Sequence, residues 1–169
     1  MRTQSIQKHM LQSSFCVMAC DGEIHDLEIQ EIYKIAKETP YFEDLDIALE
    51  IEEFEKSLKE KGRIFFSEYF HELENQDIDE IQKLLLFEVV LRIIHADQKL
   101  DENEVRFLRA MKKRLDLPEE LIRDRFGEVK ALGIRGSLSY ESLSSKELAN
   151  KFEIQEIPKL DIDEGDSKP

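Results

Sequence analysis

Two segments of the chain share one pattern of acidic residues that could bind a divalent cation. They are residues 20–28 (CDGEIHDLE) and residues 96–104 (ADQKLDENE). Each has a small residue, an Asp, two variable positions, Ile or Leu, three variable positions and a Glu. Hard cations take carboxylate oxygens as ligands. The candidate ligands of Ca²⁺ or Mg²⁺ are therefore Asp21, Glu28, Asp97 and Glu104.

A standard EF-hand calcium loop is excluded, although the first segment has the Asp, Gly, Ile and Glu of its second half. The two upstream ligands of that loop would fall on Val17 and Ala19 in the first segment, and on Ile93 and His95 in the second. Apolar side chains cannot replace carboxylates there. Any cation site would need a different geometry.

Helix capping is an alternative role for the same residues. Glu28 and Glu104 stand three residues after His25 and Asp101, where a capping-box Glu bonds back to the backbone. The two Asp residues would then only shape turns. If two helix-turn-helix halves pack about a pseudo-twofold axis, however, all four carboxylates would approach each other and attract a cation. The sequence leaves both roles open.

A basic cluster stands out against the acidic background. Arg106, Arg109 and Lys113 would share one helix face, opposite an apolar seam. This face is either solvated and paired with local Glu residues or a docking patch for an acidic protein surface.

Other chemistry has little support. The four histidines lack zinc-ligand spacing, and no phosphate-binding loop or nucleophile elbow occurs. Cys16 and Cys20 lie four apart in an apolar stretch, which indicates core packing rather than a nucleophile or a disulfide. We therefore expect no enzymatic activity.

Apolar spacing and cap residues predict helices that position these segments. The second helix should bury Leu27, Asp77 with Glu80 should cap the fifth, and Gly133 should stop the last. The expected ranges are 5–19, 25–38, 43–60, 64–73, 77–94, 101–115 and 118–132. Apolar residues flanking the two acidic segments also match, which indicates an internal repeat.

The amino-acid composition limits both the fold of the chain and the partners that it can bind. Hydrophobic residues make up 41% of the 169, charged residues 37%, and the formal net charge is −14. This predicts an all-α fold, with a helical domain over 1–132 and a poorly ordered acidic tail over 133–169 that docks or acts as a spacer. The charge disfavours direct binding to nucleic acid. No signal peptide or transmembrane segment is evident, so we expect a cytoplasmic protein that meets membranes only through a partner.

The paired Asp-Gly-x-Ile-x-x-x-Glu and Asp-x-x-Leu-x-x-x-Glu segments, each between amphipathic helices, resemble the TerB-like tellurite-resistance family over residues 5–132. A related domain occurs in J-domain cochaperones. Gln98 replaces the usual Gly of the second turn. The resemblance implies about seven helices in two pseudo-symmetric halves. It also implies a stress-response module with a divalent metal at Asp21, Glu28, Asp97 and Glu104, acting through protein partners. The alternative is a metal-independent subunit of a bacterial defence or regulatory complex.

Overall fold

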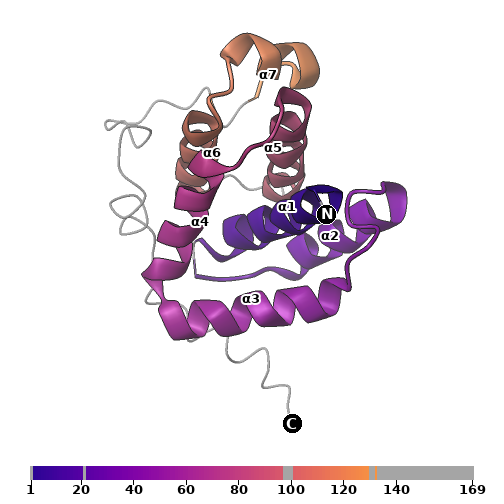
Figure 1. The fold of residues 1–169 in the computed structure, drawn as a ribbon, viewed down its shortest axis with the longest axis vertical. Coiled ribbons are helices and arrows are strands. Elements are labelled where there is room, and N and C mark those ends of the chain that lie inside the picture. Colours follow the sequence, from indigo (N-terminus) through magenta and orange to yellow (C-terminus); the bar gives the residue numbers. More distant parts are fainter. Residues whose placement is uncertain (1, 21, 97–100, 130–131, 133–169) are drawn as a thin grey trace.

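The chain folds into seven α-helices, with no strand, over the residues that the computed structural model describes, which are 2–20, 22–96, 101–129 and 132. This confirms the all-α prediction. In chain order the helices are α1 (Arg2–Ala19), α2 (Asp26–Glu38), α3 (Ile47–Lys61), α4 (Arg63–Asn75), α5 (Glu80–Ile94), α6 (Glu102–Leu115) and α7 (Glu119–Phe126). Figure 1 shows α3 at one end of this body and α7 at the other.

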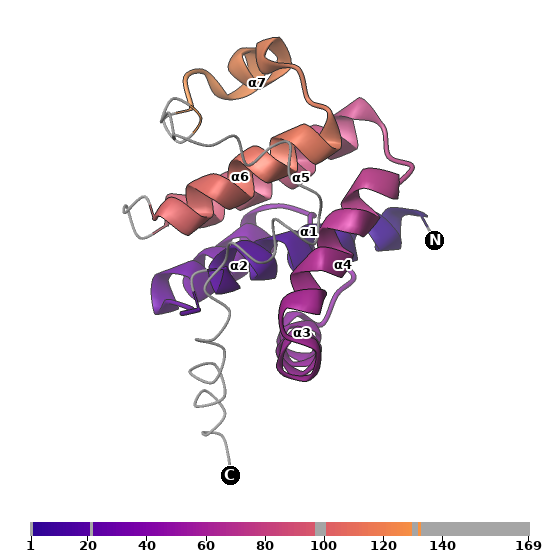
Figure 2. The same ribbon diagram turned by 90° about the vertical axis from the view of Figure 1, so that its left-hand side faces the viewer.

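Helices α1 and α5 form the most extensive packing contact and lie at the centre. Helix α2 packs on α5, while α6 packs on α1, α4 and α5. Helix α3 contacts α1 and α4 and runs across the direction of α5 and α6, so it is seen end-on in Figure 2. The helices that precede the two acidic segments are thus direct neighbours. The pseudo-twofold relation between the halves remains a prediction.

Aromatic rings join three of these helices in the core. Tyr69 and Phe70 of α4 contact Phe107 of α6, with ring centroids 5.6 and 5.2 Å apart. Phe15 of α1 contacts Phe65 of α4 at 5.9 Å. Offset and edge-to-face ring pairs of this kind add to the free energy gained from burying the rings. The aromatic cluster therefore fixes α4 against both α1 and α6.

Helices α3 and α4 are separated by one residue, Gly62. It ends α3 and begins α4 with φ of 60° and ψ of −132°. Glycine adopts positive φ readily because it lacks a Cβ. Asp46 begins α3, since its carboxylate accepts a hydrogen bond from Leu49 N at 3.2 Å.

Three local predictions were wrong. The cap of α5 is Asp79 with Gln82, not Asp77 with Glu80, because Asp79 accepts from Gln82 N at 2.8 Å and Gln82 accepts from Asp79 N at 3.0 Å. Helix α7 ends at Phe126, where Gly127 takes φ of 73°, rather than at Gly133. Leu27 is 50% exposed because it lies on the outer side of α2.

None of the helices in the described part of the chain combines the length and apolarity needed to span a bilayer. The predicted tail, residues 133–169, lies outside the described residues, so the division at residue 132 stays a prediction.

Candidate functional site

Glu28 caps the helix that follows the first acidic segment. It lies in the first turn of α2, and its Oε1 accepts a hydrogen bond from the backbone N of His25 at 3.0 Å. Its side chain is almost fully buried, with 1% of its surface exposed. The N-cap His25 is half-buried and the next residue, Asp26, is exposed.

Glu104 occupies the same place in the second segment. Its Oε1 accepts a hydrogen bond from Asp101 N at 3.3 Å, at the start of α6. It is 2% exposed. Asp101 in turn accepts from Asn103 N at 2.7 Å, and Glu102 is exposed. The capping role that the sequence left open is therefore present for both glutamates.

The start of a helix suits a buried carboxylate. Its unpaired N–H groups and dipole favour negative charge, which offsets part of the cost of removing the group from water. Glu28 and Glu104 share this environment, at the third helical position of α2 and α6. The two acidic segments thus place one buried carboxylate each at equivalent points of the fold.

The other two candidate ligands, Asp21 and Asp97, lie outside the described residues. Within the described ranges, no group of three or more His, Cys, Asp and Glu side chains is arranged to hold a metal ion. The cation site predicted from the sequence would need Asp21 and Asp97 in addition to these two glutamates.

The predicted basic face on α6 is partly engaged within the chain. Arg106 contacts Glu102 at 3.0 Å and Asn103 at 2.9 Å. Arg109 donates to the Leu132 carbonyl at 3.3 Å, while Lys113 is exposed. The two arginines hold local structure, and Lys113 remains accessible to a partner.

The two cysteines pack in the core as predicted. Both are free thiols with no exposed surface. Burial, with a smaller effect of Glu72, raises the pKa of the Cys16 thiol well above its ordinary value. A thiol that resists ionisation is a poor nucleophile.

His9 forms a buried polar contact between α1 and α4. Its ring stacks on Tyr69 at 5.7 Å, and the Tyr69 hydroxyl lies 2.6 Å from that of Ser13. Burial lowers the pKa of His9 from 6.5 to about 4. A buried imidazole of this kind stays neutral near pH 7 because its charged form would lack the hydration that stabilises it in water.

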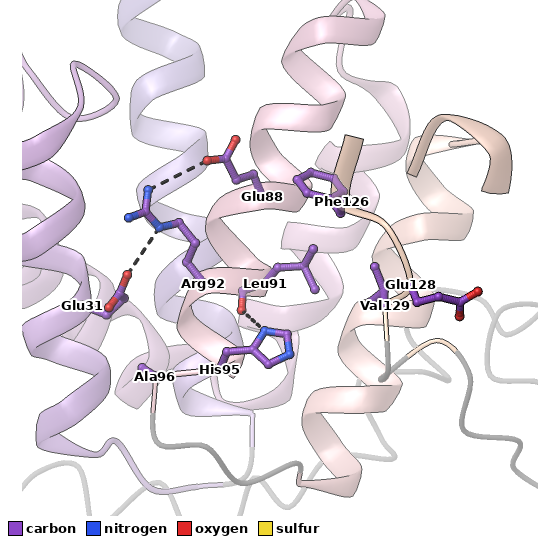
Figure 3. A pocket seen from close by; sticks show the side chains of 9 residues that line it. All are labelled: Glu31, Glu88, Leu91, Arg92, His95, Ala96, Phe126, Glu128 and Val129. Atoms are coloured by element: carbon purple, nitrogen blue, oxygen red, sulfur yellow. Dashed lines mark hydrogen bonds and ion pairs between the residues drawn. The ribbon is translucent and has the colours of Figure 1, made fainter. Parts of the chain in front are cut away.

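An open cavity of about 520 Å³ lies where α2, α5 and the end of α7 meet. Its polar lining comes from Glu31, Glu88, Arg92, His95 and Glu128. Figure 3 shows the charged side chains Glu31, Glu88 and Arg92 together on one side of this cavity.

Ion pairs join the three segments around this cavity. Arg92 lies 3.4 Å from carboxylate oxygens of both Glu31 and Glu38 on α2. Glu88 accepts from Arg125 at 2.8 Å and from the Tyr41 hydroxyl at 3.2 Å. The hydrogen bond to Glu88 raises the pKa of Arg125 above its ordinary value. Ion pairs therefore link α5 to α2 and α7.

Sequence reasoning missed this cavity. The available signal was the pair Glu88 and Arg92, two charges four residues apart in the otherwise apolar run 84–94. Charges inside an apolar helix indicate partners on neighbouring elements. The sequence did not show which elements those were.

Comparisons with known proteins bear on the family of the chain. No curated protein and no solved structure matched it. The family described as "Tellurite resistance protein TerB" has a model that matches residues 7–124. The match runs from α1 into α7 and includes both acidic segments. With the all-helical fold, it establishes that this chain belongs to the TerB family of tellurite resistance proteins.

Proposed function

We propose that this protein is a non-enzymatic, cytoplasmic module of the tellurite-resistance type, which binds a divalent cation at its twin acidic turns and acts through protein partners. The observation that carries the cation site is the matched pair Glu28 and Glu104. Both sit at the third position of a helix and are 1% and 2% exposed.

Capping and cation binding are compatible. A carboxylate has two oxygens and about four lone pairs, so a capping bond to one oxygen does not prevent coordination of a metal. Asp21 and Asp97 would supply the remaining side-chain ligands. A site made only of oxygen ligands favours Ca²⁺ or Mg²⁺ over softer metals.

Calorimetric titration with Ca²⁺, Mg²⁺, Mn²⁺ and Zn²⁺ tests this proposal. We expect saturable binding of Ca²⁺ or Mg²⁺, and at least about a tenfold loss of affinity in the double variant Asp21→Asn with Asp97→Asn, because two charged ligands become neutral. The control is the double variant Asp26→Asn with Glu102→Gln, which neutralises exposed acids in the first turns of the same two helices. It should bind the metal as tightly as the unmodified chain does. Absence of binding at millimolar metal would refute the cation site.

A metal-independent interaction subunit is the second candidate. It is favoured by the basic last turn of α6, where Lys112 is half-buried and Lys113 exposed in a chain of net charge −14. A basic site on an acidic protein attracts an acidic protein surface.

Charge reversal tests this second candidate. The tagged chain and its Lys112→Glu with Lys113→Glu variant are used for affinity capture from the native cell, followed by quantitative mass spectrometry. We expect a specific partner to be depleted at least about tenfold by the variant, since like charges across an interface repel. The control is Lys34→Glu with Lys37→Glu on α2, which makes the same charge change elsewhere. Equal depletion by both variants would show a net-charge effect and contradict a docking site on α6.

A further inference from the structure

The cavity between α2, α5 and α7 is large enough for a small organic ligand. Its volume of about 520 Å³ falls within the usual range of ligand pockets, roughly 300–1,000 Å³. Phe126 and Val129 line it on the side opposite Glu31 and Arg92, with Leu91 and His95 between them (Figure 3). One side is therefore suited to a charged group and the other to a carbon chain.

His95 contributes a polar ring to the lining of this cavity. Its Nδ1 lies 2.9 Å from the Leu91 carbonyl oxygen. A carbonyl can only accept, so Nδ1 is the donor in this contact and its hydrogen points back to the helix rather than into the cavity. Figure 3 shows the edge of the ring away from the Leu91 carbonyl turned toward Val129.

Two cationic groups are already paired with carboxylates, Arg92 in the cavity lining and Arg125 just outside it. Arg92 lies 3.4 Å from Glu31, 3.4 Å from Glu38 and 3.9 Å from Glu88, and Arg125 lies 2.8 Å from Glu88. Glu128 adds a further carboxylate at the rim. Three carboxylates, Glu31, Glu88 and Glu128, and one guanidinium group, Arg92, therefore line the cavity. This excess of negative charge favours a cationic ligand that donates hydrogen bonds.

We propose that this cavity binds a primary ammonium group carried on a short apolar chain. The ammonium group lies on the side lined by Glu31 and Glu88, and the carbon chain lies against Leu91, Phe126 and Val129. An inorganic ion would use the carboxylates but not the apolar side, whereas an alkylammonium ion uses both. This function is separate from the cation site proposed at the acidic turns.

Titration of the full chain with n-hexylamine, followed by NMR of the backbone amides, tests the proposal. We expect saturable shifts at Leu91, Ala96 and Val129 at millimolar concentrations. Hexan-1-ol and hexanoate have the same carbon chain with a neutral or negative end, so they should bind at least about tenfold more weakly. Equal binding of all three would overturn the proposal, and so would the absence of saturation.

A blocked lysine, Nα-acetyl-lysine methylamide, distinguishes two sources of the same chemistry. If it binds at least as tightly as hexylamine, the natural ligand is a lysine side chain. Weaker binding of the blocked lysine identifies a free amine. Both results support an ammonium site.

Matched variants locate the site. Glu31→Gln removes a carboxylate that lines the cavity, and Glu38→Gln removes the other α2 partner of Arg92, which does not line it. We expect Glu31→Gln to weaken hexylamine binding about five- to tenfold, and Glu38→Gln by less than about twofold. Val129→Trp, which fills the cavity without changing charge, should abolish binding. Circular dichroism confirms that each variant is folded. Equal effects of the two Gln variants, or unchanged binding by Val129→Trp, would place the amine elsewhere.

Discussion

Lowering the pH from 7 to 4 is expected to destabilise the native chain by about 3 kcal/mol more than a His9→Leu variant. The reason is that burial lowers the pKa of His9 from 6.5 to about 4 in the folded state. Between these values the unfolded chain takes up a proton that the folded chain does not. The loss of stability therefore begins as the pH falls below about 6.5 and is complete near pH 4.

Urea unfolding at pH 7, 6, 5 and 4, with the native chain and His9→Leu side by side, measures this difference. Carboxylates that titrate in the same range affect both proteins and cancel in the comparison. A Ser13→Ala variant, which removes the hydroxyl beside Tyr69 but keeps the imidazole, is the control and should retain the full pH dependence. Parallel stability curves for the native chain and His9→Leu would show that the pKa of His9 does not change on folding, which would contradict the prediction.

Replacing both capping glutamates with alanine, Glu28→Ala with Glu104→Ala, is expected to lower the free energy of unfolding by about 2–4 kcal/mol. Each change leaves the backbone N–H of His25 or Asp101 without its carboxylate acceptor and opens space at a buried position. Urea denaturation at pH 7 without added metal measures the effect.

Glutamine variants separate capping from cation binding. Glu28→Gln with Glu104→Gln keeps an oxygen for each capping bond, so it should lose less than about half as much stability as the alanine pair. It should nevertheless bind divalent metal more weakly, because it lacks two negative charges. Asp26→Ala, an exposed acid in the first turn of α2, is the control and should cost no more than about 0.5 kcal/mol. If the alanine pair costs no more than this control, the capping bonds contribute nothing measurable.

The sequence predicted the helices well because their apolar spacing is strong. All seven were anticipated, and capping, one of the two roles that the spacing left open for Glu28 and Glu104, is observed for both. Helix starts were harder where two acids compete. Asp77 and Asp79 both precede α5, and only the backbone geometry selects Asp79 with Gln82.

Side chains whose roles depend on tertiary contacts could not be predicted. The apolar seam predicted for α6 placed Arg106 and Arg109 on one face of the helix. It did not predict that Arg109 would donate a hydrogen bond to the Leu132 carbonyl. Burial of His9 against Tyr69 and the meeting of Arg92 with Glu31 likewise join segments distant in the chain. Periodicity reports which face of a helix is apolar, and it does not report which helix covers that face.

The single-residue junction between α3 and α4 has a stereochemical consequence. An added Cβ at Gly62 would meet no atom within 4 Å, so empty space is available for a side chain. Only the torsion angles there, φ of 60° with ψ of −132°, disfavour an L-amino acid. The direction in which α4 leaves α3 is thus encoded by the achirality of one residue, and not by the bulk of its neighbours.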